Sequence, residues 1–241
     1  MTTRIFVAGA AGAIGRQLVP MLVGDGHAVT GTTRSAERAS WLESVGARAA
    51  VLDAYDADAV RAAVLATDAE VVIHQLTDLA LGFGPEELAK NSRLREVGTR
   101  NLVDAALATG ARRFIAQSGA WLYADGPLPH DEMHPLRTPT DAPEDASLRA
   151  VIELERLVTQ AAGLDGIVLR YGFFYGPGTA WDRDTAPLPR VSVEAAARAA
   201  ALAVESGPPG LYNVIDDDLT VSNRRARDLL GWAPDDPVGF V

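Results

Sequence analysis

The stretch GAAGAIG at residues 9–15 decides the fold of this chain. It follows the apolar run 5–8, which is typical of a strand, and leads into Leu18, Met21 and Leu22, whose spacing is typical of a helix. Glycines between a first strand and a first helix allow a tight turn and let the backbone approach a pyrophosphate closely. A turn without a ligand explains one glycine but not three at this spacing. The stretch therefore predicts a dinucleotide-binding turn.

The rest of the chain repeats this alternation of short β-rich runs and longer helical patterns, which is typical of βαβ units. We predict an α/β fold, a doubly wound parallel sheet (Rossmann fold) with a small C-terminal substrate-side region. The expected strands are residues 5–8, 28–33, 47–52, 71–74, 114–117, 167–170 and 211–214.

Composition limits the partners of the chain. With 241 residues and 48% apolar content, one main core is expected. A formal charge of -10 disfavours nucleic acid and anionic membranes, and no apolar run approaches the roughly 18 residues of a membrane span. There is no cysteine, so disulfides and thiolate ligands are excluded. We expect a cytoplasmic protein that binds a small molecule and holds no metal; its oligomeric state stays open.

Two Pro/Gly-rich stretches interrupt the periodic pattern. We predict a dinucleotide-binding core over residues 1–175 and a small substrate-side extension over 176–241 that packs on it. Residues 125–145 form a long aperiodic loop after a strand, which indicates either a lid over a substrate or a disordered surface loop.

The ends of the predicted strands supply the expected cofactor contacts. The helix N-terminus after the first strand attracts phosphate, which assigns Gly9, Ala11, Gly12, Ala13 and Ile14 to the cofactor. The second strand ends in Arg34 without a carboxylate, which favours the 2′-phosphate of NADP (NADPH) over NAD; the alternative is a solvated surface arginine. The third and fourth strands add Asp53, Ala54, Leu76 and Thr77, while His74 is expected to be a hydrogen-bonded core residue.

Several longer stretches carry motifs of a known family: GAAGAIG (9–15), VGTRNLVDAA (97–106), RRFIAQSGAWLYADG (112–126), ELERLV (153–158), LRYGFFYGPGT (169–179), GLYNVIDDD (210–218) and NRRARDLLGWAP (223–234). In these stretches the chain resembles the extended and atypical short-chain dehydrogenases/reductases, the NAD(P)-dependent epimerase/dehydratase-like group. The resemblance implies that a further four residues bind the nicotinamide side of the cofactor: Gln117, Tyr171, Gly172 and Phe173.

The chain departs from that family at its catalytic positions. The resemblance implies an Asn, a Ser/Thr and a Tyr-x-x-x-Lys pair, in which Tyr donates a proton and Lys binds the ribose and lowers the Tyr pKa. Ser147 stands in the Tyr position, Val151 in the Lys position and Arg95 in the Asn position. The single lysine, Lys90, lies elsewhere. The usual acid is therefore absent.

Ser118 is the predicted catalytic residue, since it stands at the end of the fifth strand, although alignment on Tyr123 moves the family hydroxyl to Gly119. The segment 178–191 is shorter than in the family, which disfavours a nucleotide-sugar site. Trp121, Phe173, Phe174 and Trp181 are candidates for an apolar substrate cavity or for ordinary core.

We therefore predict an NADPH-dependent ketoreductase for a small, aromatic polyketide-type ketone, as in polyketide antibiotic biosynthesis, since relatives that lack the Tyr and Lys include such enzymes. Water or the substrate itself would supply the proton. The alternatives are a non-catalytic NADP-binding regulator or redox sensor, and a sugar-nucleotide epimerase or dehydratase.

Overall fold

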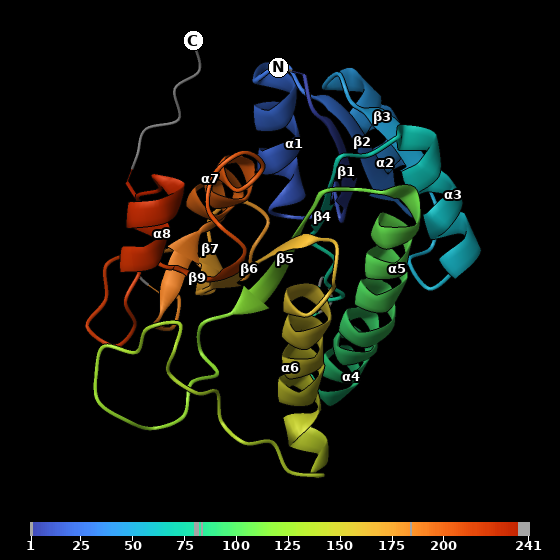
Figure 1. Ribbon diagram of the computed structural model, residues 1–241. Coiled ribbons are helices and arrows are strands. Elements are labelled where there is room, and N and C mark those ends of the chain that lie inside the picture. The colour runs from blue at the N-terminus through green and yellow to red at the C-terminus, as the bar shows by residue number, and fades with distance from the viewer. Residues whose placement is uncertain (1, 80–81, 83, 184, 236–241) are drawn as a thin grey trace.

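The chain forms one parallel sheet covered by helices on both faces (Figure 1). The computed structural model describes residues 2–79, 82, 84–183 and 185–235. The seven strands lie in the order β3-β2-β1-β4-β5-β6-β9 and confirm the predicted doubly wound sheet. The strands are β1 (Arg4–Ala8), β2 (Ala28–Thr33), β3 (Arg48–Val51), β4 (Val71–His74), β5 (Arg113–Gly119), β6 (Asp165–Tyr171) and β9 (Gly210–Val214).

Alternate residues of each strand enter different cores. In β1, Ile5 and Val7 pack in one apolar cluster, and Phe6 and Ala8 pack in the other. The first cluster faces helices α1, α2, α7 and α8, and the second faces α3, α5 and α6. Burial on both faces explains why the inner strands β1 and β4 are almost entirely apolar instead of alternating. The helices are α1 (Gly15–Gly24), α2 (Ala36–Ser44), α3 (Ala57–Thr67), α4 (Pro85–Arg93), α5 (Thr99–Thr109), α6 (Ala146–Thr159), α7 (Val193–Leu202) and α8 (Arg224–Leu230).

A single π-helical turn, η1 (Leu94–Gly98), joins α4 to α5. Such turns are rare and often occur at functional sites. Here the turn lies next to the carboxyl end of β4, since Thr99, which follows it, bonds the His74 ring at 2.9 Å.

The C-terminal segment is built into the main sheet. β9 pairs with β6 over five residues, and α7 packs on α1. The Trp232 indole donates to the Ala195 carbonyl at 2.8 Å, so the segment after α8 is also anchored to this layer. α7, β9, α8 and Trp232 therefore share one core with the N-terminal strands, and the division at residue 175 stays a prediction.

Two short strands were missed by the sequence pattern. β7 (Phe173–Tyr175) and β8 (Arg190–Ser192) form a separate two-stranded parallel sheet. Strands of three residues carry too little periodicity to be recognised within a Pro/Gly-rich stretch.

Residues 125–145 lie against the C-terminal segment. The His130 N–H donates to Thr220 O, and Ser222 N–H donates to His130 O. Glu132 Oε1 accepts the Asn213 N–H of β9 at 2.7 Å, so this loop covers part of the outer edge of the sheet. The loop ends in a 3₁₀ turn, η2 (Pro143–Asp145). Its role as a lid stays a prediction.

Candidate cofactor and substrate site

The turn between β1 and α1 has the geometry that its glycines predict. Gly9 has φ +85°, and a Cβ there would lie 2.5 Å from Gln75 O. A Cβ at Gly15 would lie 2.3 Å from Ala10 O. Both positions therefore require glycine. Ile14, the N-cap of α1, makes no side-chain capping bond, while the N–H groups of Arg16 and Gln17 already donate to Gly12 O and Ile14 O. The turn just before them, residues 13–15, and the partial positive charge of this helix end are therefore what an anion would meet.

A pocket opens beside this turn at the carboxyl ends of β1 to β4. Eight of the predicted cofactor residues line it: Gly9, Ala11, Gly12, Arg34, Asp53, Ala54, Leu76 and Thr77. The other residues that line it are Thr32, Thr33, Ser35, Arg38, Leu52, Tyr55, Gln75, Asp78 and Leu94. The predicted residues Ala13, Ile14, Gln117, Tyr171, Gly172 and Phe173 do not line this pocket.

Arg34 stands at the rim of the pocket with its side chain 67% exposed. Its guanidinium lies 3.7 Å from Asp78 Oδ1. The loop beneath it is fixed by Ser35, whose N–H donates to Thr33 Oγ1 and whose hydroxyl caps α2. An exposed, loosely paired guanidinium at this place is able to turn toward a phosphate without leaving a buried charge behind.

Tyr55 is a pocket residue that sequence reasoning missed. Its N–H donates to Asp53 Oδ1 at 3.0 Å, and the Arg93 guanidinium lies 5.2 Å from its ring centroid. Burial raises the pKa of the Tyr55 phenol. Its position directly after Ala54 was the available signal, as was the position of Asp78 directly after Thr77; Leu94 reaches the pocket from another segment and gave none.

Gln75 is a buried polar side chain beside the pocket. Its Nε2 and Oε1 have no hydrogen bond within 3.5 Å among the residues that the structure describes, although the Tyr171 hydroxyl lies close enough for Gln75 to lower its pKa. Incompletely bonded buried groups are rare in folded proteins. Together with the close backbone approach that Gly9 and Gly15 allow, this side chain is consistent with a dinucleotide in the pocket.

His74 is a core residue, as expected. Its Nδ1 accepts the Leu76 N–H at 3.1 Å, and its Nε2 lies 2.9 Å from Thr99 Oγ1. Burial, assisted by the positive charge of Arg95, lowers the pKa of His74 to about 3. The neutral ring therefore holds the turn after β4 in place.

Ser118, the predicted catalytic residue, is fully buried. Its hydroxyl donates to Glu155 Oε1 at 2.6 Å, and the same carboxylate pairs with Arg170 at 2.6 Å. Arg170 also donates to the Tyr123 hydroxyl, which donates in turn to Asn213. The hydroxyl of Ser118 thus belongs to a buried network that links β5, α6, β6 and β9, and its catalytic role stays a prediction.

Gly119, the alternative position for the catalytic hydroxyl, lies against the ring of a tryptophan, Trp121. A Cβ at Gly119 would lie 2.7 Å from the Trp121 ring. Trp121 stacks on Phe173 with centroids 4.7 Å apart, and Phe173 meets Trp181 edge-on at 5.9 Å. These three half-buried rings form an aromatic cluster where β5 and β6 end, which we call the aromatic cluster below.

The remaining predicted nicotinamide-side residues lie near the same strand ends. Tyr171 is fully buried and donates to Ala196 O, and burial raises its pKa. A Cβ at Gly172 would lie 2.7 Å from Arg190, and Gln117 is buried. Ser147 lies 3.3 Å from the Ser92 hydroxyl, and Val151 is fully buried.

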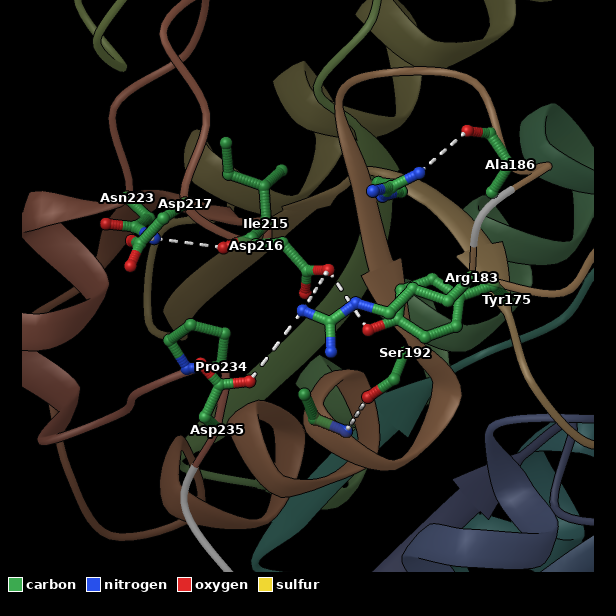
Figure 2. Close-up of polar contacts among 12 residues, drawn as sticks. Tyr175, Arg183, Ala186, Ser192, Ile215, Asp216, Asp217, Asn223, Pro234 and Asp235 are labelled. Carbon is green, nitrogen blue, oxygen red and sulfur yellow. Dashed lines mark hydrogen bonds and ion pairs between the residues drawn. The ribbon is translucent and has the colours of Figure 1, made fainter.

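A polar cluster around Asp216 joins Tyr175, Arg183 and Asp235 (Figure 2). The Tyr175 hydroxyl donates to Asp216 Oδ2 at 3.0 Å, and Arg183 approaches the same oxygen at 3.5 Å. Arg183 also lies 3.9 Å from Asp235. Burial raises the pKa of Asp216. The cluster ties the segment between β7 and β8 to the end of β9.

Among the residues that the structure describes, no group of three or more His, Asp or Glu side chains is arranged to hold a metal. His130 and His134 stack at 4.0 Å, and His134 Nε2 lies 2.9 Å from Ala124 O. Within the same residues, no helix has the length and apolarity needed to span a membrane.

Residues 5–213 match the family model of the NAD dependent epimerase/dehydratase family. The chain belongs to this family. A 3-diazoavenalumate denitrifying reductase of a Streptomyces species is 46% identical over 239 residues, which cover 89% of this chain and 76% of the relative. A 4-hydroxy-2-methyl-3-oxo-4-farnesyl-3,4-dihydroquinoline-1-oxide ketoreductase of Stigmatella aurantiaca is 30% identical over 78% of this chain and 54% of its own length. The family and these reductases identify the chain as an NAD(P)H-dependent oxidoreductase.

Solved structures of the same fold are more distant in sequence. The UDP-glucose 4-epimerase of Thermotoga maritima, solved with UDP-glucose, superposes with a TM-score of 0.78 at 19% identity and covers 97% of this chain and 94% of its own. The enzyme WbmG of Bordetella bronchiseptica, solved with NAD and UDP, superposes with a TM-score of 0.79 at 16% identity; the match covers 98% of this chain and 90% of WbmG. They agree with the Rossmann architecture.

Proposed function

We propose that this family member is an NADPH-dependent reductase that delivers hydride to a small aromatic substrate without a protein acid at the reacting atom. One observation carries the proposal: the phosphate-binding turn is intact, while Ser147 and Val151 stand at the positions of the family's Tyr and Lys. The bound cofactor would supply the hydride. The protein would orient the substrate, and the aromatic cluster offers flat apolar faces for a ring.

Two substrate classes fit a site without an acid. In the first, a diazonium group on an aromatic ring is replaced by hydrogen: a C–H bond forms, the C–N bond breaks and N₂ leaves with that bond's electron pair. NADPH is oxidised and no proton is needed. We favour this class because the relative named a denitrifying reductase is 46% identical over 89% of this chain.

The second class is the aromatic polyketide-type ketone predicted from the sequence. Here hydride adds to the carbonyl carbon and a proton must reach the oxygen, from water or from a hydroxyl of the substrate. The 30% identity to a quinoline ketoreductase favours this class. A role in polyketide antibiotic biosynthesis follows only in this case.

The preference for NADPH is part of the proposal. It rests on Arg34 at the pocket rim and on the absence of a carboxylate at the end of β2, where Thr32 and Thr33 stand. A cytoplasmic location and a small-molecule substrate belong to the same proposal.

The test is NADPH oxidation with hydroxylated benzenediazonium salts, hydroxylated quinones and aromatic ketones, with NADH in parallel. Trapped N₂ equal to the NADP formed, and deuterium from labelled NADPH in the arene, support the first class. Turnover of ketones alone moves the assignment to the second.

Because diazonium salts also react without a catalyst, the control is Gly12→Glu. A Cβ at Gly12 would lie 3.3 Å from Gly9 O, a tight contact that the turn must relieve by a few tenths of an ångström, and the side chain would bring a carboxylate to the place where phosphate would bind. Turnover that survives in this variant is not enzymatic. Tight NADPH binding by the unmodified protein with no turnover in either class would instead favour the regulator.

A further inference from the structure

Arg95 is a buried cation that the site so far leaves unexplained. The residue is 5% exposed, and burial lowers the pKa of its guanidinium to about 10, so it stays charged at neutral pH. Its guanidinium makes no hydrogen bond or ion pair with any other residue that the structure describes. An unpaired buried charge destabilises the folded protein. Its presence therefore indicates a ligand that supplies the missing hydrogen-bond acceptors.

The position of Arg95 relates it to the cofactor site. Its neighbour Leu94 lines the nucleotide pocket, and a Cβ at Gly98 on the same turn would lie 3.7 Å from Leu76. The charge of Arg95 lowers the pKa of His74, the last residue of β4. Arg95 therefore lies beside the carboxyl end of β4, between the pocket and α6, against which η1 packs.

A further donor near this place also lacks an acceptor. Asn91 Nδ2 is buried without a partner in the described part of the chain. Asn91 Oδ1 accepts the Asp78 N–H at 2.9 Å, which holds it against the turn that carries Gln75. Gln75 Nε2 has no acceptor within 3.5 Å, and its side chain is near the Tyr171 hydroxyl. The cation of Arg95 and the free donor of Asn91 thus lie beside the segment that follows β4.

The path of the dinucleotide identifies the acceptor. Its adenosine half belongs in the pocket with Arg34 and Asp53, and its pyrophosphate belongs at the N-terminus of α1. The remaining half must then pass over the ends of β4 and β5 toward the aromatic cluster. The first group on that path is the second ribose, which carries two adjacent hydroxyls.

We propose that Arg95 binds the hydroxyls of the nicotinamide-side ribose and is the cation that positions this half of the cofactor. The proposal rests on cofactor binding as given under the proposed function. The only lysine, Lys90, is unsuited to this role because it forms an exposed ion pair with Glu86 at 2.7 Å.

The experiment compares Arg95→Met, which keeps the length and removes the charge, with Arg95→Lys and with the control Arg100→Met. Arg100 is exposed and pairs with Glu153 on the surface. Calorimetric titrations use ADP, ADP-ribose, NADH and NADPH. We expect Arg95→Met to weaken ADP-ribose, NADH and NADPH about tenfold to a hundredfold and to leave ADP unchanged, since ADP lacks the second ribose. Arg95→Lys restores part of the loss, and Arg100→Met changes nothing.

Thermal unfolding of the cofactor-free protein supplies a second readout. Arg95→Met melts no lower than the unmodified protein, because the unpaired charge is gone. Unchanged affinity for all four nucleotides with an altered KM or kcat would overturn the proposal in favour of a substrate contact. Equal weakening of ADP with a lower Tm would overturn it in favour of a structural role. Absence of NADPH and NADH binding in the unmodified protein would instead refute the proposed function.

Discussion

Replacement of Ser118 by alanine separates a structural from a catalytic role for this residue. Its hydroxyl donates to Glu155 Oε1 at 2.6 Å, an oxygen that also accepts Arg170 Nε at 2.9 Å. Hydrogen bonds to charged groups contribute about 1.5–3 kcal/mol. Since the site is fully buried, water cannot replace the lost donor. We expect the free energy of unfolding to fall by about this amount.

For a domain of this size, about 1 kcal/mol shifts Tm by roughly 2–4 °C, so the expected loss is about 3–12 °C. Because the hydroxyl proton is already engaged, we expect kcat per folded molecule to change by less than about threefold. Loss of a donor to a developing oxyanion would instead cost about a hundredfold or more in kcat.

The assay combines calorimetric unfolding with steady-state NADPH oxidation on the same preparation. Ser44→Ala is the control, since its hydroxyl bonds a local carbonyl, Trp41 O, on an exposed helix. A hundredfold fall in kcat with an unchanged Tm would refute this reasoning and restore the catalytic role predicted for Ser118.

Three further predictions follow from the same site. We expect Arg34→Ala to weaken the affinity for NADPH about tenfold to a hundredfold and to leave the affinity for NADH nearly unchanged, as measured by fluorescence titration. Equal weakening of both affinities would remove the basis for a preference for NADPH. Since the pKa of His74 is lowered from 6.5 to about 3, this residue takes up a proton only on unfolding over that range. The free energy of unfolding should therefore fall by up to about 1.4 kcal/mol per pH unit as the pH drops from 6.5 toward 3. Urea titrations from pH 4 to 7 should show a shallower slope in His74→Asn, and equal slopes would contradict the assignment. Gly119→Ser places a Cβ 2.7 Å from the Trp121 ring and is expected to cost about 1–3 kcal/mol, recovered in part by Trp121→Ala; additive losses in the double variant would argue against the clash.

The sheet was predictable because its strands are buried on both faces and are separated by helical patterns. All seven expected strands are present, and even the shortest, β3 and β4, were found within two residues of their ends. β7 and β8 were missed because each has three residues, and because they pair with each other across the Pro/Gly-rich segment 176–189. Pairing over such a distance leaves no local pattern in the sequence.

The nucleotide half of the site was predictable because its residues follow strand ends in sequence order. Tyr55 and Asp78 directly follow predicted residues and were overlooked, whereas Leu94 enters the pocket through tertiary packing and was not foreseen. The environment of Ser118 was equally unpredictable. Its partner Glu155 lies on α6, and no local sequence pattern indicates that the Ser118 hydroxyl donates a hydrogen bond to this buried carboxylate. The role proposed for Arg95 depends on the absence of a partner for its side chain among the described residues, which the sequence alone does not reveal.

The place of β9 at the edge of the sheet has a consequence for synthesis on the ribosome. β6 ends at Tyr171, whereas its partner β9 begins at Gly210. At about 5–20 residues per second, the edge of β6 stays open for roughly 2–8 s after it emerges. An open, apolar strand edge is prone to pair with other chains. Overexpression should therefore yield aggregates of nascent chains, and slower translation at low temperature or a chaperone that shields this edge should raise the yield of folded protein.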